Sequence, residues 1–406
     1  MILFYLIYIL VTLSLLIWLY ILFDPARPWD FSPVGDDGPV PAIPASTVAP
    51  DLCILVPARN EAESLPRTLP ALLAQDYPGA YRILLIDDRS DDGTAEIARK
   101  IAAESGHSER LLVIKGQPLP DKWTGKMWAL DQGVKAAFAS GKPGFFLLTD
   151  ADILHAPASV RRLVSESMTG NLALNSRMAR LRCASPAERM LIPAFVFFFN
   201  LLYPMRKVND AANKMAAAAG GCVLLSAQAV EHIGGGFESI RSEIIDDVNL
   251  GRQVKKHKLP IRLSLSRTEV VSLREYPLVD DIWRMVRRTA FTELKYSWLR
   301  LAGSIFGLLL LFVIPFLAFF AGVFVISLQG DLGARILGLA AIGKGALVLA
   351  IMRVTYSPAV RFFELPATYS YTLPWSGVLY GMMTFDSALR YARGKRLEWR
   401  NTQGPV

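Results

Sequence analysis

The stretch FFLLTDADIL (residues 145–154) places an unbroken apolar run directly before two carboxylates, Asp150 and Asp152. An apolar run bounded by polar residues is typical of a buried central strand in a parallel sheet. Ligands of open α/β sheets bind outside the carboxyl ends of such strands. Two carboxylates there repel each other and are costly to bury unless a cation binds them. The stretch therefore indicates either a solvated, Asp-rich turn or a site for a divalent cation such as Mg²⁺ or Mn²⁺.

Strands and helices alternate upstream of this stretch, and two more strands follow it. This alternation predicts βαβ units and an α/β fold with a mostly parallel sheet. The predicted strands are 52–57, 81–88, 111–116, 171–178 and 222–226, and the predicted helices are 63–75, 93–106 and 126–140.

The chain is too apolar for an ordinary soluble enzyme, with 52% hydrophobic residues among 406 and a mean hydropathy of +0.32. Residues 1–23 carry no charge and lack the features of a cleaved signal peptide, which predicts a retained membrane anchor. Further spans are predicted at 301–328 and at 334–354, where Lys344 interrupts the apolar run. The segment 362–390 is broken by a proline and is expected to span, to re-enter or to lie in the interface.

The remaining segments complete the predicted domain organisation. Residues 24–49 are rich in Pro and Gly and predict an extended linker, and 50–300 form the globular domain. Interfacial helices are expected within that domain, near 187–206 and 280–300. The alternative for the first of these is a buried core helix. Residues 391–406 form a basic tail.

Composition excludes several classes of protein. The net charge of +8 does not indicate nucleic-acid binding, because no aromatic-rich basic motif accompanies it. The basic residues cluster beside apolar runs, as in RMVRR (284–288), which suits an anionic cytoplasmic leaflet. Three scattered cysteines and four isolated histidines predict no disulfide framework, no zinc site and no histidine-based triad.

Polar residues also follow the first two predicted strands, at the sheet edge where the DAD carboxylates are expected. The first strand runs into VPARNEAES (56–64) and the second into IDDRSDDGT (86–94). Carboxylate and amide groups at this edge can bind the base and ribose of a nucleotide. Asn60 alone could instead cap a helix. Asp87 and Asp88 are less readily explained as caps, because they are adjacent and follow an apolar strand.

The segment DKWTGKMWAL (121–130) places Lys126 after a glycine at the start of a predicted helix. A lysine beside a helix N-terminus suits a diphosphate. The alternative, a solvated surface lysine, is the commoner position for a single lysine.

The segments VPARNE, IDDRSDDGT and DAD, in this order on successive strands, resemble the GT-A fold of family 2 glycosyltransferases over about residues 50–290. The resemblance implies a Rossmann-like cytosolic domain, a nucleotide-sugar donor, a divalent metal (Mg²⁺ or Mn²⁺) and an inverting transfer. The order of segments, with WTGK, the anchor and an apolar C-terminal tail, is most similar to the hopene-associated glycosyltransferases.

The resemblance also assigns site residues. Asp150 and Asp152 match the DxD pair of the family, with Asp152 as the direct metal ligand. Gly220 and Gly221 resemble a loop that shapes the sugar and acceptor pocket, where glycine allows close backbone approach. The residues that match the nucleotide-binding segments are Pro57, Ala58, Asn60, Glu61, Asp87 and Asp88.

An inverting transfer needs a base that takes a proton from the acceptor hydroxyl. The segment SEIIDDVNLG (242–251) resembles the acidic ED…LG segment of the family, with Asp246 in the place of Glu and Asp247 in the place of the catalytic Asp. A partly desolvated carboxylate would have a raised pKa that suits this role. Alternatively, the two aspartates cap a helix that begins at Val248.

One departure from the family bears on processivity. Processive members carry a QxxRW motif, whereas DDIWRMVRRTAF (280–291) has no Gln and no Trp after its arginine pair. The difference predicts transfer of a single sugar. Arg287 and Arg288 could contact the donor diphosphate or, equally, a lipid headgroup.

Nucleotide sugars are cytosolic, so the catalytic domain is expected in the cytoplasm of an integral protein of the bacterial inner (plasma) membrane. The basic tail then lies inside if 362–390 does not span. A membrane-held site indicates a lipid acceptor, and the resemblance suggests a hopanoid or another isoprenoid lipid. Transfer to polyprenyl phosphate and a catalytically idle membrane scaffold remain the alternatives. A transporter is disfavoured, because most charges lie outside the predicted spans.

Overall fold

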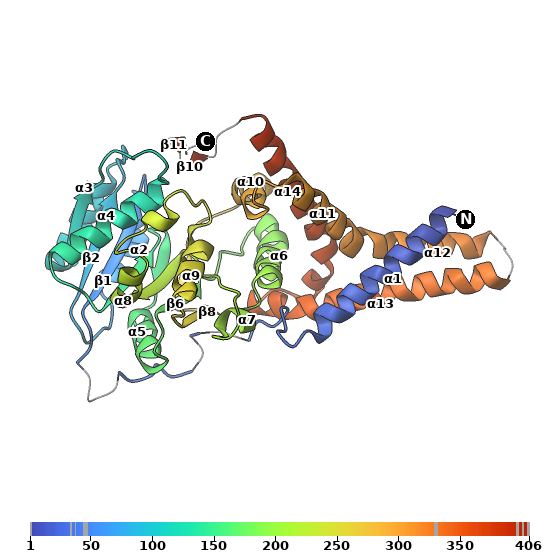
Figure 1. Cartoon of the computed structure of the whole chain (residues 1–406), viewed down its shortest axis with the longest axis horizontal. Helices are drawn as coiled ribbons and strands as arrows, with labels where there is room; N and C mark the ends of the chain where they lie inside the picture. The colour runs from blue at the N-terminus through green and yellow to red at the C-terminus, as the bar shows by residue number, and fades with distance from the viewer. Residues whose placement is uncertain are drawn as a thin grey trace. The chain divides into compact units, whose positions relative to one another are not determined.

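The computed structural model describes residues 2–32, 35–36, 38–43, 48–328, 332–394, 398–399 and 402–403. The chain divides into two units, which Figure 1 shows coloured along the sequence. The helical unit contains Met1–Phe31, Cys183–Pro204 and Tyr276–Lys395, and the α/β unit contains Ser32–Arg182, Met205–Glu275 and Arg396–Val406.

A seven-stranded sheet of order β3-β2-β1-β4-β7-β6-β8 forms the α/β unit. Six strands run in the same direction, and β7 is antiparallel to both of its neighbours. This arrangement confirms the predicted mostly parallel α/β sheet. The strands are β1 (Leu52–Ala58), β2 (Tyr81–Asp87), β3 (Leu111–Lys115), β4 (Phe145–Thr149), β6 (Leu174–Met178), β7 (Cys222–Ser226) and β8 (Ile261–Leu265).

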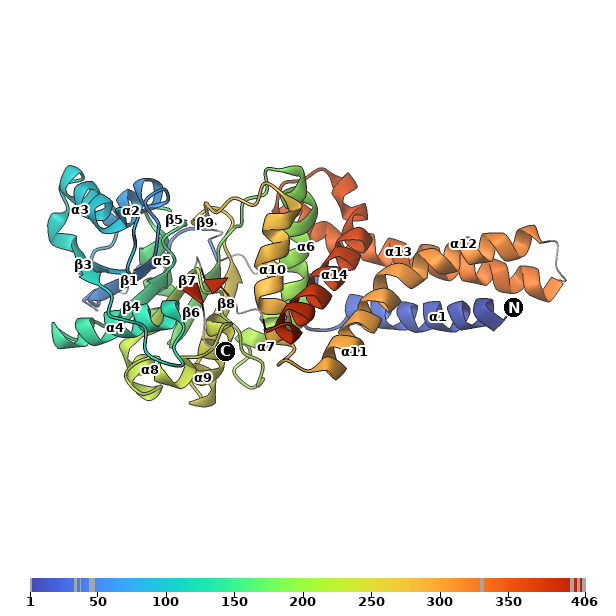
Figure 2. The same ribbon diagram turned by 90° about the horizontal axis from the view of Figure 1, so that it is seen from above.

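Helices cover both faces of this sheet, which is why its central strands are continuous apolar runs. Every residue of β1 is buried. Figure 2 shows α2, α3 and α5 on one side of the sheet and α4 on the other. The helices of the unit are α2 (Leu65–Leu73), α3 (Thr94–Glu104), α4 (Gly125–Ala139), α5 (Ser159–Thr169), α7 (Met205–Asn209), α8 (Ala227–His232) and α9 (Asp246–Lys256), with 3₁₀ turns η1 (Ser108–Arg110) and η2 (Glu238–Ile240).

A small ribbon joins two segments that lie far apart in the sequence. Strand β5 (Ile153–His155) pairs antiparallel with β9 (Val270–Ser272), so that Ile153 lies opposite Ser272. The Leu273 N–H donates to the Asp152 carbonyl at 2.9 Å and extends the pairing up to the DAD turn. A second ribbon joins β10 (Glu398–Trp399) and β11 (Thr402–Gln403).

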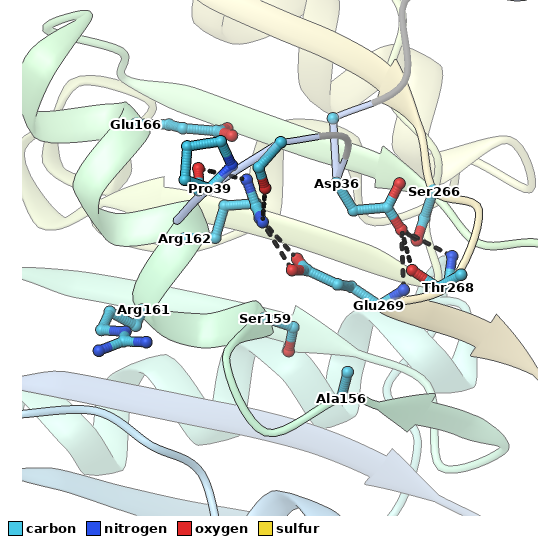
Figure 3. Close-up of polar contacts among 12 residues, drawn as sticks. Asp36, Pro39, Ala156, Ser159, Arg161, Arg162, Glu166, Ser266, Thr268 and Glu269 are labelled. Atoms are coloured by element: carbon cyan, nitrogen blue, oxygen red, sulfur yellow. Dashed lines mark hydrogen bonds and ion pairs between the residues drawn. The ribbon is translucent and has the colours of Figure 1, made fainter. Parts of the chain in front are cut away.

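Part of the predicted linker is bound along the α/β unit as a strap (Figure 3). The Asp36 carboxylate accepts hydrogen bonds from the Thr268 N–H at 2.7 Å and from the Glu269 N–H at 2.8 Å. Arg162 bridges the Glu269 carboxylate, at 2.8 Å, and the carbonyl of Gly38, at 2.9 Å. The strap therefore holds the turn between β8 and β9 in place.

Among the described residues, three helices of the helical unit are long and apolar enough to cross a membrane, and they agree with the three predicted spans. They are α1 (Ile2–Phe23), the run Trp298–Ser327 and α13 (Leu332–Phe362). The run consists of α11 (Trp298–Leu308), the π-turn η3 (Leu309–Val313) and α12 (Ile314–Ser327).

Small residues allow these helices to pack closely. A Cβ atom on Gly322 of α12 would lie 2.5 Å from the Gly338 carbonyl oxygen of α13, so a larger residue would separate the helices. Lys344 donates a hydrogen bond to the Thr12 hydroxyl at 2.7 Å and lies 3.8 Å from the centre of the Tyr8 ring. The Lys344 ammonium, which interrupts the third predicted span, is thus bound by side chains of α1.

The predicted interfacial helices belong to the helical unit and lie outside the α/β unit to which the sequence assigned them. Phe198 of α6 packs edge-on against the rings of Phe312 and Tyr380, so α6 is partly a buried helix of this unit. Pro374 lies in the first turn of α14 and does not break it, because proline is tolerated at a helix start. The remaining elements are α6 (Pro186–Leu202), α10 (Val279–Glu293), η4 (Ala367–Tyr371) and α14 (Leu373–Ala392).

Candidate active site

The loops that follow β1 and β2 are tied to each other. Strand register places Ala58 opposite Asp87, and the Asp88 N–H donates to the Ala58 carbonyl at 2.8 Å. Asn60 has a left-handed backbone (φ +54°), which asparagine tolerates, and its side-chain oxygen accepts the Asp91 N–H at 3.0 Å. Asn60 therefore joins the two loops and caps neither helix.

Asp88 is buried between two arginines in this loop pair. Its carboxylate lies 3.4 Å from Arg59 and 3.3 Å from Arg89. Burial raises the pKa of Asp88, and the two guanidinium groups oppose that rise without cancelling it. A carboxylate in this setting is held rigidly and can accept hydrogen bonds from a ligand.

The other predicted nucleotide-binding residues lie at the same edge. Pro57 stands opposite Ile86 in the strand register, and the Glu61 N–H donates to the Thr94 hydroxyl at 2.9 Å. The Asp87 carboxylate accepts the Ser90 N–H at 3.0 Å. Pro57, Ala58, Asn60, Glu61, Asp87 and Asp88 are thus brought together, as the sequence predicted.

The DAD turn follows β4, the strand beside β1, and each of its carboxylates faces a cation. Asp150 lies 2.7 Å from the Lys126 ammonium, and Asp152 lies 3.2 Å from the Arg274 guanidinium. The Thr68 hydroxyl donates to the Ala151 carbonyl at 2.7 Å and fixes the turn between them. The pairing neutralises two carboxylates that would otherwise repel each other.

Lys126 is the centre of a charged cluster. It stands one residue inside the start of α4, as predicted, and its ammonium also lies 3.6 Å from Asp246. It donates to the Gly220 carbonyl at 3.4 Å. Although burial opposes its charge, the carboxylates of Asp150 and Asp246 hold the pKa of Lys126 well above its ordinary value. Lys126 therefore stays charged and links the DAD turn to the second acidic pair.

Asp247 lies within the same cluster. One carboxylate oxygen accepts the Gly220 N–H at 2.9 Å, and the other accepts the Val248 N–H at 2.8 Å. Burial and the neighbouring charge of Asp246 raise the pKa of Asp247 to about 6, against the opposing effect of Lys126. A carboxylate with this pKa is largely ionised at neutral pH and can still accept a proton.

The two aspartates belong to the first turn of α9, which begins at Asp246 and not at the predicted Val248. The residue that precedes the helix, Ile245, makes no side-chain capping bond. The helix dipole favours negative charge in the first turn of a helix, so the two aspartates also stabilise α9. The bonds to Gly220 and Lys126 nevertheless direct both carboxylates toward the cluster.

Two predicted site residues stand on α10, in the helical unit. Arg287 lies 3.3 Å from the Asp386 carboxylate, which also accepts the Trp283 indole N–H at 2.8 Å. Arg288 follows Arg287 on this helix. Their contact with a donor diphosphate or a lipid headgroup remains a prediction.

Sequence reasoning missed Arg274 and a buried histidine. Arg274 follows β9, and only the pairing of β9 with β5 brings it to Asp152. His155 lies 2.8 Å from the Thr149 hydroxyl, which donates to the Gly221 carbonyl at 3.0 Å. Burial lowers the pKa of His155 to about 4, so it is neutral. The only sequence signal was position, since His155 follows the DAD turn closely and Arg274 follows a short apolar run.

Asp150 and Asp152 offer the hard oxygen donors that Mg²⁺ or Mn²⁺ prefers. Within the described part of the chain, no three His, Cys, Asp or Glu side chains are grouped so as to hold an ion by themselves. The pair fits a metal whose remaining ligands are substrate phosphates and water. The cations that face both carboxylates show that the position attracts positive charge.

Comparison with known proteins gives a family match and two partial relatives. Residues 53–234 match the family model "Glycosyl transferase family 2". An undecaprenyl-phosphate 4-deoxy-4-formamido-L-arabinose transferase of Aeromonas hydrophila is 29% identical over 119 residues, which are 29% of this chain and 33% of the relative. An undecaprenyl-phosphate mannosyltransferase of Micrococcus luteus is 32% identical over 124 residues, 30% of this chain and 46% of the relative. The chain thus spans less than half the length of these relatives.

A solved structure resembles the whole chain. A mannosyltransferase from Pyrobaculum calidifontis, in complex with GDP-Man and Mn²⁺, aligns with a TM-score of 0.54 over 97% of this chain and 100% of the other. The sequence identity is 15%, so the likeness concerns the fold alone. Together with the family match and the sheet order, it confirms the predicted GT-A fold.

Proposed function

Because residues 53–234 match the family 2 glycosyltransferase model, we propose that the chain is a membrane-bound enzyme that transfers one sugar from a nucleotide-sugar to a lipid. The expected donor is a UDP-sugar, and the transfer is inverting and metal-dependent. The observation that carries the proposal is the convergence of Asp150, Asp246 and Asp247 around Lys126 at the carboxyl edge of the sheet.

The loops after β1 and β2 support the proposal that the chain binds a nucleotide-sugar donor. Their carboxylate and amide groups are held by backbone hydrogen bonds, so they are ordered before a ligand arrives. The base and ribose would bind at these loops. Lys126 would meet the diphosphate, which requires that its ammonium turn from Asp150 toward phosphate oxygens.

Asp150 and Asp152 would hold Mg²⁺ or Mn²⁺ together with the phosphates of the donor. A bound ion of this kind stabilises negative charge on the leaving nucleoside diphosphate. Lys126 and Arg274 would remain beside the site and add positive charge there. Arg274 also orients Asp152, because β9 is fixed by its pairing with β5.

Asp247 is the proposed base. Its carboxylate would take the proton of the acceptor hydroxyl while the hydroxyl oxygen attacks the anomeric carbon from the face opposite the leaving group. One bond to the sugar forms as the bond to the diphosphate breaks, which inverts the anomeric centre. The two backbone N–H donors at Asp247 hold the carboxylate in one orientation, which favours proton transfer.

The acceptor is proposed to be a lipid because three helices in the described part of the chain are long and apolar enough to cross a bilayer. A hopanoid or another isoprenoid alcohol is our specific proposal. Transfer of a single sugar is supported by residues 280–291, which have no Gln and no Trp after the arginine pair, unlike the processive motif. We propose a bacterial inner-membrane location with the α/β unit in the cytoplasm, where nucleotide sugars are made.

A second candidate acceptor is polyprenyl phosphate, which the names of the two partial relatives favour. A phosphate acceptor is already an anion, so it needs no base for its attack. The replacement Asp247→Asn separates the candidates. It should abolish transfer to a hydroxyl and leave transfer to a phosphate nearly intact.

The test uses the full chain, purified and placed in lipid nanodiscs. Radiolabelled nucleotide sugars are supplied with a bacterial lipid extract, a hopanoid alcohol or undecaprenyl phosphate, with and without EDTA. Label should enter one lipid in a metal-dependent manner. Asp152→Ala should abolish transfer, whereas Asp121→Ala, at an exposed position outside the site, should not.

Two results would contradict the proposal. Transfer that persists in Asp152→Ala, or in excess EDTA, would argue against the metal site. Absence of transfer from every donor, together with no UDP or GDP binding by calorimetry in the folded protein, would favour an idle scaffold.

A further inference from the structure

The helical unit contains a cavity of about 660 Å³ that the proposed reaction does not use. It lies between α12, α13 and η4. Arg353 and Arg361 line it from α13, and Tyr371 lines it from η4. Apolar walls are supplied by Phe319 and Leu349. The cavity thus combines a basic wall with an apolar one.

The two arginines lie on one face of α13. They are eight residues apart, with Ser357 midway, so successive members of the row are four residues apart. The separation along the helix is about 12 Å, which two long side chains can close around one small anion. The Arg353 guanidinium lies 5.0 Å from the centre of the Tyr371 ring.

In the residues that the structure describes, no Asp or Glu side chain forms an ion pair with Arg353 or Arg361. Both are exposed, unlike Arg287 on α10, which is paired with Asp386. Two unpaired guanidinium groups beside an apolar wall form a site for an anion that carries an apolar chain.

The position along α13 corresponds to the edge of a bilayer. Residues 332–352 are enough to cross the hydrocarbon region, for which about 20 residues suffice, so Arg353 falls just beyond it. Tyr371 and Trp375, which are 59% and 64% exposed, belong to the segment that follows α13. Exposed Tyr and Trp are typical of the level of the lipid headgroups.

The apolar wall of the cavity belongs to α12 and α13, two of the described helices that are long and apolar enough to cross a membrane. We therefore propose that Arg353 and Arg361 bind the phosphate of a membrane lipid, whose chain lies against Phe319 and Leu349. The phosphate belongs either to an anionic phospholipid or to a polyprenyl phosphate, and both offer the same charged oxygens.

Lipid binding is measured without a sugar donor, so the test does not depend on the proposed reaction. The purified full chain in neutral detergent is titrated with phosphatidylglycerol or undecaprenyl phosphate, and bound lipids are counted by native mass spectrometry. The double variant Arg353→Gln/Arg361→Gln is compared with Arg335→Gln, which removes an exposed arginine near the opposite end of the same helix. The double variant should bind at least about tenfold more weakly, and the control should match the wild type.

The wild type alone provides a second test, which does not require that any variant fold. Undecaprenol, which lacks the phosphate, should bind at least about tenfold more weakly than undecaprenyl phosphate. Loss of both phosphate lipids in the double variant identifies a general headgroup site, and loss of undecaprenyl phosphate alone identifies a site for that lipid. Unchanged binding of both lipids by a folded double variant would overturn the proposal, and so would equal binding of undecaprenol.

Discussion

Asp247 differs from the other carboxylates of the site in its surroundings. It is half-buried beside Asp246, and it accepts two backbone hydrogen bonds that favour its ionised form. The net result is a pKa raised to about 6, above that of an ordinary aspartate. At residue scale, the proposed function therefore depends on how three carboxylates share the charge of Lys126.

Replacing Asp247 with Asn should remove the base and keep the shape of the site. Transfer to a lipid hydroxyl should fall about 10²- to 10⁴-fold, the usual contribution of a general base. Donor binding by calorimetry should change little, because Asp247 acts on the acceptor. Asp121→Asn serves as the control at an exposed position. Near-normal turnover of a hydroxyl acceptor would show that another group takes the proton.

The rate of transfer should depend on pH through Asp247. A base works only when deprotonated, so the rate should rise with pH through a midpoint of about 6. Lysine 126 lowers the pKa of Asp247, so Lys126→Met should move this midpoint to higher pH. Lys115→Met, at an exposed position on β3, should leave the midpoint in place. A midpoint unchanged in Lys126→Met would refute the electrostatic link between Lys126 and Asp247.

At the scale of elements, the strap connects the start of the α/β unit with its site. Asp36 holds the turn after β8, and β9 follows that turn and pairs with β5. Arg274, two residues after the end of β9, reaches Asp152. An aspartate in a Pro/Gly-rich segment thus supports the geometry of the DAD turn from a distance.

Asp36→Asn should lower the thermal stability of the protein. An amide cannot replace a carboxylate that accepts hydrogen bonds from three backbone N–H groups and a hydroxyl. The free energy of unfolding should fall by about 1–3 kcal/mol, which corresponds to a fall in Tm of about 2–12 °C. Tryptophan fluorescence on heating measures the change, with Asp121→Asn as the control. An unchanged Tm would mean that the strap adds nothing to stability.

The same carboxylate gives a pH dependence of stability. Burial alone would raise the pKa of Asp36, but hydrogen bonds from Glu269, Thr268 and Arg267 hold it below its ordinary value. The stabilisation is therefore present above the unfolded-state pKa, about 4, and is lost as pH falls through the lower folded-state pKa. Melting curves between pH 3 and 7 should show a smaller loss of Tm at low pH in Asp36→Asn than in the wild type.

At the scale of the whole molecule, the number of membrane crossings decides where each unit functions. Three helices qualify by length and composition, and α14 is not among the candidates in the described residues. If all three helices cross, as we propose, the segment after α1 and the segment after α13 lie on the same side of the membrane. Nucleotide sugars then reach the α/β unit only if that side is the cytoplasm.

Cysteine labelling in intact cells checks this arrangement. Ser327→Cys, at the end of α12, should react with a membrane-impermeant maleimide, and Ser140→Cys, in the α/β unit, should react only after permeabilisation. Cys183 is replaced with Ser in both. Cys53 and Cys222 are buried, and burial raises the pKa of their thiols to about 11 and about 12, so they stay unreactive. Labelling of Ser140→Cys in intact cells would reverse the proposed orientation.

The sequence by itself determined the strands, the order of the motifs and three apolar helices. These features depend on residues two to four positions apart, because a strand repeats every two residues and a helix about every 3.6. The apolar run before Asp150 therefore predicts a strand, which is β4 in the structure. The predicted strand 222–226 coincides with β7. The edge at which Asp87, Asp88 and Asp150 meet also followed, because the carboxyl ends of parallel strands share one edge of a sheet.

Only the tertiary structure decided which side chains meet. Arg274 reaches Asp152 through the pairing of β5 with β9, and Lys126 joins Asp150 to Asp246 across two helix starts. The strap, the burial of α6 and its grouping with the helical unit depend likewise on contacts between distant segments. The periodicity of the local sequence does not predict such contacts. Their free energy arises only when the chain has folded and water has left the space between the contacting groups.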